Sequence, residues 1–130
     1  MSERTTIIDE IIALFRDISG IGDVSRHWKS WDQTDDFPAL FVNAGNEEYR
    51  YNTGEHYDSS MEVLIVGYTK DEDDPDGVID DHLSDTIIAF GGLDRPKFLI
   101  SCGTSGRMYA PFGIFELTVR VDYEFSLSSP

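Results

Sequence analysis

The segment from Gly113 to Phe125, GIFELTVRVDYEF, alternates apolar and polar side chains from its third residue onward. A period of two places the two kinds of side chain on opposite faces of a β-strand. The apolar members are Phe115, Leu117, Val119, Val121, Tyr123 and Phe125, and the polar members between them are Glu116, Thr118, Arg120, Asp122 and Glu124. We therefore predict a strand with one buried and one solvated face, as in an antiparallel sheet covered on one side.

Other segments also have the composition of strands. They are Val24–Trp31, Phe37–Asn43, Glu47–Asn52, Tyr57–Tyr68 and residues 98–103. The segment Phe37–Asn43 is apolar on both faces, so we expect both of its faces to be covered. Gly54 lies between two of these segments and predicts a loop or hairpin turn. The apolar run from Val63 to Val66 is typical of a central strand.

Two segments repeat apolar residues at the spacing of an amphipathic helix. Their stripes are Ile7, Ile11, Leu14, Phe15 and Ile18 in the segment Thr5–Ile18, and Ile79, Leu83, Ile87 and Phe90 in the segment from Asp76 or Gly77 to Phe90. Ser2, Thr5 or Thr6 is placed to cap the first helix. Gly20 and Gly22 are placed to end the first helix, and Gly91 and Gly92 the second.

The resulting order, α-β-β-β-β-α-β-β, predicts an α+β protein. We expect one domain over residues 1–130, with two α-helices packed on a mixed or antiparallel β-sheet of about five strands. A chain of this length has room for one hydrophobic core.

The chain has 25 acidic and 10 basic residues, which gives a formal charge of −15. Such a surface repels phosphates over a Debye length of about 8–10 Å. Because neutralisation of phosphates by Lys and Arg dominates affinity for nucleic acids, we expect no specific nucleic-acid binding. A negative channel wall would nevertheless let a DNA duplex slide past without adhering.

No apolar stretch reaches the ~20 residues of a membrane span, and the N-terminal residues have no signal-like apolar core. We therefore expect a cytoplasmic protein without a membrane partner. Cys102 is the only cysteine, so no intrachain disulfide forms. We expect its side chain to be buried as a small apolar group.

The acidic run KDEDDPDG, residues 70–77, is the strongest candidate for a metal site, because Ca²⁺ prefers carboxylate ligands. Its carboxylates include Asp71, Asp73, Asp74 and Asp76. The EF-hand spacing fails, since Leu83 stands where the bidentate Glu belongs. We predict an exposed loop that supplies a helix N-cap, and no metal.

The evidence in the sequence for a catalytic site is as weak as that for a metal site. His27, His56 and His82 are too far apart in the chain for a zinc motif. Ser101 and Ser105 lack the context of a nucleophile elbow, and the glycine-rich residues 102–106 lack the Lys of a P-loop. We predict a protein without catalytic or cofactor-binding residues, which is not an enzyme.

Aromatic side chains with a polar group are enriched at protein interfaces. Tyr49 and Tyr51 alternate with Arg50 on a polar run, which favours an interface over a core position. For the two tryptophans, core packing is an equal alternative. The candidate oligomer or tube-contacting residues are Tyr49, Arg50, Tyr51, Tyr57, Trp28 and Trp31.

The arrangement of segments resembles the phage tail-terminator (tail-completion) family, the lambda-like minor tail proteins at the head-proximal end of the tail tube. The resemblance is one of layout over most of the chain. It rests on the N-terminal helix followed by Gly20 and Gly22, then Val24-Ser-Arg-His-Trp28, Phe37-Pro-Ala-Leu-Phe-Val42 and Glu48, Met61–Tyr68, the helix at 79–90, and Pro111-Phe-Gly113-Ile-Phe-Glu116-Leu-Thr-Val119. The acidic loop at 71–76 departs from this layout.

The resemblance implies a structural virion protein that assembles in the host cytoplasm. Such proteins form a ring, usually of six subunits, on the last ring of the tail tube. The ring stops tube growth and offers a surface to the head-completion or connector protein, while DNA passes through without specific binding. No catalytic residue is implied.

Three other readings remain open at the level of sequence. The first is another phage head-tail joining or neck protein. The second is a small enzyme or ligand-binding domain with a pocket near His27, Trp28 and Tyr123. The third is an acidic adaptor that mimics DNA, which requires an array of carboxylates on one convex face.

Overall fold

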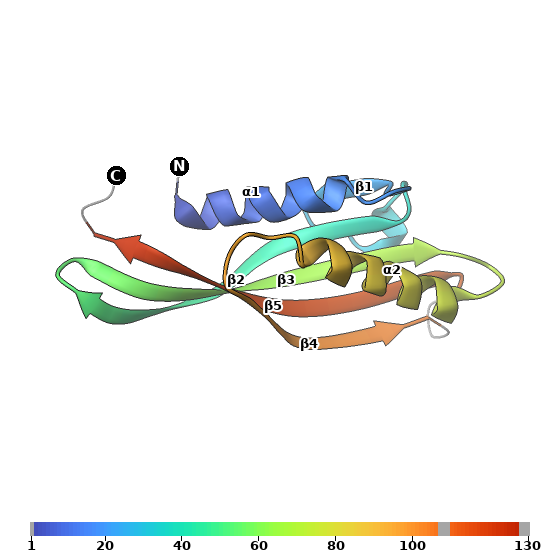
Figure 1. The fold of residues 1–130 in the computed structure, drawn as a ribbon. Coiled ribbons are helices and arrows are strands. Elements are labelled where there is room, and N and C mark those ends of the chain that lie inside the picture. Colours follow the sequence, from blue (N-terminus) through green and yellow to red (C-terminus); the bar gives the residue numbers. More distant parts are fainter. Residues whose placement is uncertain (1, 107–109, 128–130) are drawn as a thin grey trace.

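The computed structural model of the chain describes residues 2–106 and 110–127. In chain order its elements are α1 (Glu3–Arg16), β1 (Asp23–Ser25), the 3-10 helix η1 (Trp31–Gln33), β2 (Ala39–Thr53), β3 (His56–Lys70), α2 (Pro75–Phe90), β4 (Lys97–Ser105) and β5 (Phe112–Ser126) (Figure 1). Neither helix is long and apolar enough to cross a bilayer.

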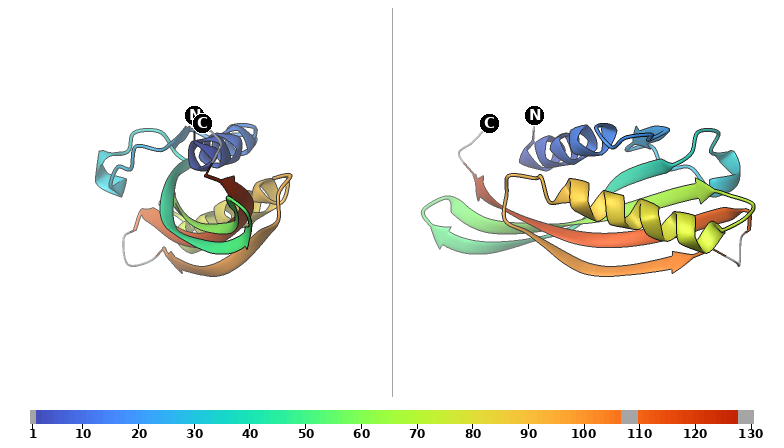
Figure 2. Two further views of the ribbon diagram at one scale, coloured as in Figure 1. Left: turned by 90° about the vertical axis from the view of Figure 1, so that its left-hand side faces the viewer. Right: turned by 45° about the vertical axis from the view of Figure 1, so that its right-hand side comes forward.

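The strands form one sheet in the order β1-β2-β3-β5-β4. β1 is parallel to β2, and the other neighbouring pairs are antiparallel, so the sheet is mixed. Both helices lie on the same side of the strongly twisted sheet (Figure 2). The predicted α+β class, with two helices packed on about five strands, is confirmed.

The main core fills the space between the helices and this side of the sheet. Phe115, Leu117, Val119 and Val121 of β5 point into it, as predicted, together with apolar residues of β2 and β3. Tyr123 packs at its border, and Phe125 lies beyond it on the same face of the sheet. Its most completely buried members include Ile7, Ile8, Ile11, Phe15, Leu40, Val42, Met61, Val63, Ile65, Phe115, Val119 and Val121. The apolar face of the strands and the apolar face of α1 therefore pack against each other in one core.

Local signals set the starts of both helices. The Ser2 hydroxyl accepts a hydrogen bond from the Thr5 backbone N–H, and α1 accordingly begins two residues earlier than the segment Thr5–Ile18 suggested. Asp74 caps α2 in the same way by accepting from the backbone N–H of Gly77 at 3.0 Å. Pro75 then occupies the first turn, where its missing N–H costs nothing.

The predicted strand Val24–Trp31 is wrong beyond Ser25. The chain leaves the sheet there and returns at Ala39, after the short helix η1. In between, Trp31 and Phe37 pack against a second apolar cluster on the sheet face opposite the helices, which consists of Ala39, Phe41, Val66 and Tyr68. Packing of these aromatic rings against the cluster stabilises the excursion, and it covers the second face of β2 as expected.

The two predicted segments Phe37–Asn43 and Glu47–Asn52 are one strand, β2, so the order is α-β-β-β-α-β-β. A bulge between Ala44 and Glu47 takes up the intervening residues without ending the strand. A Cβ atom at Gly45 would lie 3.1 Å from the backbone oxygen of Glu62, so a residue without a side chain suits this close approach.

Beyond the bulge, β2, β3 and the end of β5 project past the start of α1 as a three-stranded extension (Figure 1). We call this extension, residues 47–61 and 121–126, the arm. Leu127 N–H bonds to the Glu55 carbonyl at the hairpin end of the arm, where Gly54 adopts a positive φ of 57° in the turn.

The expectation that Cys102 is buried is wrong, since its side chain is exposed. Cys102 pairs with Leu117 and lies on β4, the outermost strand of its side of the sheet. Three apolar side chains of the same strand are also exposed, namely Phe98, Leu99 and Ile100. An edge strand has a neighbour on one side only, so an apolar residue there buries less area than one in β5.

Candidate functional site

The arm gathers four of the six aromatic and basic residues that sequence predicted for an interface. Tyr49, Arg50 and Tyr51 lie on β2, and Tyr57 lies opposite them on β3. The side chains of Tyr49 and Tyr51 are 53% and 64% exposed. Trp28 and Trp31 do not belong to this group, because they lie in the segment between β1 and β2.

The register of the strands places the arm's aromatic rings on one face. Tyr49 and Tyr123 flank Ser59, and Tyr51 and Phe125 flank Tyr57. This is the face that, two residues further along β3, carries the buried Met61. The aromatic face of the arm thus continues the core side of the sheet past the end of its helical cover.

Edge-on ring contacts hold the aromatic face together. The ring centroids of Tyr49 and Phe125 are 5.4 Å apart with an interplanar angle of 62°, and those of Tyr51 and Tyr57 are 5.8 Å apart with an angle of 79°. Such geometry is favourable because the positive edge of one ring meets the negative face of the other. The exposed rings are therefore fixed in orientation before any partner binds.

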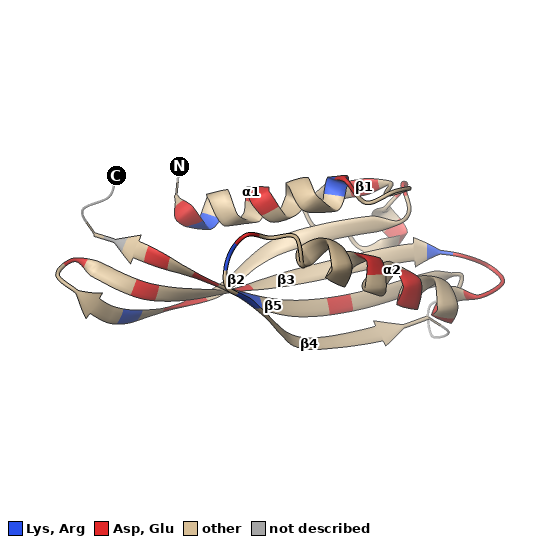
Figure 3. Cartoon of the chain, in the orientation of Figure 1, with Lys and Arg blue, Asp and Glu red and all other residues tan. Residues whose placement is uncertain are grey.

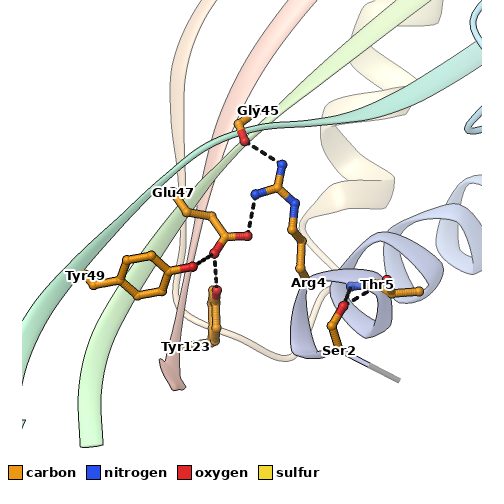
Figure 4. A network of polar contacts seen from close by, with 7 residues as sticks. All are labelled: Ser2, Arg4, Thr5, Gly45, Glu47, Tyr49 and Tyr123. Carbon is orange, nitrogen blue, oxygen red and sulfur yellow. Dashed lines mark hydrogen bonds and ion pairs between the residues drawn. The ribbon is translucent and has the colours of Figure 1, made fainter. Parts of the chain in front are cut away.

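Glu47, a residue that the sequence analysis did not single out, anchors the arm to the body (Figure 4). Its carboxylate contacts Arg4 Nη1 of α1 at 2.5 Å and accepts a hydrogen bond from Tyr123 Oη at 2.8 Å. Tyr49 Oη donates to the same carboxylate, and Arg4 Nη2 donates to the Gly45 carbonyl at 2.8 Å. These contacts join helix α1, the bulge of β2 and β5 at one point.

The environment of Glu47 favours its charged form. Burial of the side chain, which is 8% exposed, raises its pKa, but the hydrogen bonds from Tyr49, Tyr123 and Arg4 outweigh burial and leave the pKa below its usual value. The pKa of Tyr123 is raised strongly, first by burial and then by the adjacent carboxylate. Near neutral pH, Tyr123 therefore keeps its proton and donates it to a charged Glu47 carboxylate.

Charged side chains alternate with the aromatic ones along the arm and line a groove of about 980 Å³. Its charged members are Glu48, Arg50, Asp58, Arg120, Asp122 and Glu124. Several of them have partners within the arm. Asp122 accepts from Ser60 at 2.8 Å and contacts Arg120 at 3.2 Å, and Glu124 pairs with His56 at 2.9 Å.

The acidic loop between β3 and α2 binds its own backbone. The Asp71 carboxylate accepts from the N–H groups of Asp73 and Asp74 at 2.9 and 2.8 Å, and Asp74 caps α2. Asp76 lies in the first turn of α2. Within residues 2–106 and 110–127, no three His, Cys, Asp or Glu side chains are placed to hold a metal ion.

The tryptophans lie at the end of the sheet away from the arm. Trp31 packs against Phe112 with ring centroids 4.8 Å apart, and Phe112 pairs with Lys70, the last residue of β3. Trp28 is 57% exposed and lies beside the Tyr68 hydroxyl. Trp31 is thus a packing residue, whereas Trp28 remains available on the surface.

A pocket shared by His27, Trp28 and Tyr123 is not present. Tyr68, beside which Trp28 lies, pairs with Ile114, which lies nine residues from Tyr123 along β5. At the rise of a strand this separation is about 30 Å. His82 is also remote from His27, since it lies on the buried side of α2, where its Nε2 contacts the Ala39 carbonyl at 3.0 Å.

The arm is therefore the candidate site: it is anchored at Glu47, carries exposed tyrosines on one face and has carboxylates along its groove. No protein-family model matches the chain, and no curated protein sequence matches it either.

Proposed function

We propose that this protein is a structural virion protein that caps a phage tail tube as a ring, ends tail polymerisation and offers a surface for the head connector. The observation that carries the proposal is the arm, an ordered sheet extension with exposed, pre-oriented tyrosines. Rigid aromatic residues of this kind supply much of the binding energy of protein interfaces.

Both long edges of the arm support assembly by strand addition. In the described residues, β1 pairs with β2 only at Ala39–Phe41, and β4 pairs with β5 only as far as Val121. Exposed edges of this length promote uncontrolled association unless a specific partner takes them up. A closed ring satisfies such edges in every subunit, and strand addition is a common way to do so.

The resemblance in layout to tail-terminator proteins supports the same reading. So does the charge of −15, since acidic residues occur on both helices, on the arm and in the 71–74 loop (Figure 3). A ring built of such subunits would present a negative lumen, along which DNA passes without specific binding. The proposed partners are further copies of the chain, the tail-tube protein and the head-completion or connector protein. None of these roles requires a catalytic residue.

The decisive experiment combines light scattering at low and high salt with electron microscopy of polymerising tail-tube protein. We expect rings, or tubes that stop growing when the protein is added. The double variant Tyr49→Ser/Tyr51→Ser should lose this effect, whereas Ile88→Ser, which changes an apolar residue 76% exposed on α2, should keep it. A monomer that is indifferent to salt and leaves tube growth unchanged would contradict the proposal.

A further inference from the structure

Three exposed basic residues have no side-chain partner of any kind in the described part of this very acidic chain. Most cations there are engaged; Arg95, for example, pairs with both Glu3 and Glu10. Arg26, Lys29 and Arg50 make no ion pair or hydrogen bond through their side chains within residues 2–106 and 110–127, and all three are exposed. With 25 acidic residues available, cations left unpaired inside one subunit are available to carboxylates of another.

Two of these cations flank an exposed aromatic ring. Arg26 and Lys29 lie on either side of Trp28, whose side chain is 57% exposed. We call residues 26–29 the basic loop. It follows β1 and lies at the end of the sheet remote from the arm (Figure 2).

The groove of the arm has the complementary character. Glu48, Asp58 and Glu124 line it and are exposed, and Glu48 has no hydrogen-bond or ion-pair partner in the part of the chain that the structure describes. Arg50 and Arg120 line the same groove, whereas the ring of Tyr49, at an alternate position of β2, lies on the other face of the arm. The groove thus has four carboxylates against two cations, and this excess of negative charge complements a loop with two unpaired cations.

We propose that the basic loop of one copy of this chain docks in the arm groove of the next copy. Because the two surfaces lie at opposite ends of the molecule, a subunit cannot satisfy the contact by itself. The contact is head-to-tail, and a head-to-tail contact generates a ring when its rotation closes. This inference deepens the proposed function, on which it rests for the ring, by naming the surfaces that hold neighbouring subunits together.

Charge reversal at four exposed positions tests the contact. The variant R26E/K29E makes the loop acidic, and E48K/E124K makes the groove basic, so each should raise the dissociation constant for self-association at least about tenfold. The quadruple variant carries both reversals and should restore association. Sedimentation velocity up to millimolar protein measures self-association of each variant. Carbodiimide cross-linking with mass-spectrometric mapping tests whether Lys29 lies next to groove carboxylates.

The groove variant separates a specific contact from general repulsion. Two Glu→Lys reversals, each worth two charge units, bring the formal charge from −15 to −11, so E48K/E124K should associate more if net charge alone governs. The docking proposal requires that it associate less. The quadruple variant keeps the charge of −15, which makes it a matched control for the wild type.

A wild type that stays monomeric at millimolar concentration, double variants that associate like the wild type, or a quadruple variant that does not recover would each overturn the docking proposal. Its failure is distinguishable from failure of the proposed function. If the tube is capped but the reversals have no effect, the docking surfaces are wrong and the function stands. If the reversals behave as expected but tube growth continues, the function is wrong and the contact stands.

Discussion

Arg4 in the first turn of α1 contacts Glu47, 43 positions further along the chain, at the base of the arm. The contact lies where β2 resumes after its bulge, and Arg4 also donates to the Gly45 carbonyl within that bulge. A single ion pair thus connects the first turn of α1 to the base of the arm and helps to fix the orientation of the arm.

Replacing Glu47 by Gln should loosen the arm. The substitution removes the charge that Arg4, Tyr49 and Tyr123 share, so we expect the free energy of unfolding to fall by about 1–3 kcal/mol. Hydrogen exchange should accelerate in residues 47–61 more than in α2. Urea denaturation and exchange mass spectrometry measure the two effects. Glu48→Gln, at the exposed neighbouring position, is the control and should change the free energy of unfolding by less than about 0.5 kcal/mol. Equal free energies of unfolding for the two variants would show that the Glu47 contacts do not stabilise the fold.

Acid should weaken the same contacts. The pKa of Glu47 is lower in the folded protein than its usual value, so the unfolded chain takes up the proton first as the pH falls. Its contribution is therefore complete above about pH 4.3 and is lost as the pH drops through the folded pKa. Unfolding followed at successive pH values should show a shallower acid-induced loss in Glu47→Gln than in the wild type. Parallel curves for the two proteins would contradict this assignment.

The cap of α2 should be specific to one aspartate of the acidic loop. Asp74→Ala removes the acceptor for the Gly77 N–H and should cost about 1 kcal/mol, whereas Asp74→Asn keeps an acceptor and should cost much less. Asp73→Ala is the matched control, because the bonds within this loop use the Asp73 backbone. Thermal unfolding of the three variants measures the difference. A loss as large in Asp73→Ala as in Asp74→Ala would count against the capping role.

Gly67 should tolerate no side chain. It lies on the central strand β3 opposite Phe115, and a Cβ atom there would approach the Phe115 ring to 2.0 Å. We expect Gly67→Ala to lower the free energy of unfolding by about 2–3 kcal/mol through overpacking. Gly103→Ala on β4 meets open space and should have little effect. Chemical denaturation of both variants checks this; a tolerated Gly67→Ala would mean that the core repacks freely around Phe115.

Regular periodicity explains which parts of the fold were predictable. β5 and both helices followed from patterns repeated over ten residues or more, and the caps at Ser2 and Asp74 involve residues only three positions apart. The segment from Arg26 to Phe37 has no such pattern. Its conformation was not predicted, because it depends on contacts with distant residues such as Phe112. Cys102 was misjudged for a related reason, since the order of strands decides which of them lies at the edge.

Some features of the candidate site were likewise predictable from the sequence, and others were not. Exposure of Tyr49 and Tyr51 followed from a polar stretch of sequence, but their alignment with Tyr57 and Phe125 depends on the register of three strands. Glu47 was not predicted at all. Nothing near it in sequence distinguishes it from Glu48, and only the bulge after Ala44 turns its side chain toward Arg4 and Tyr123.

The sequence by itself determined the class of fold, the acidic surface and the approximate positions of the helices and of β5, because these depend on composition and on short-range periodicity. Tertiary structure alone decided the bulge at Gly45, the cover of the second sheet face by Trp31, and the gathering of Arg4, Glu47 and Tyr123. These features join residues that are tens of positions apart. Their energies come from burial and hydrogen bonding that exist only after the strands have paired.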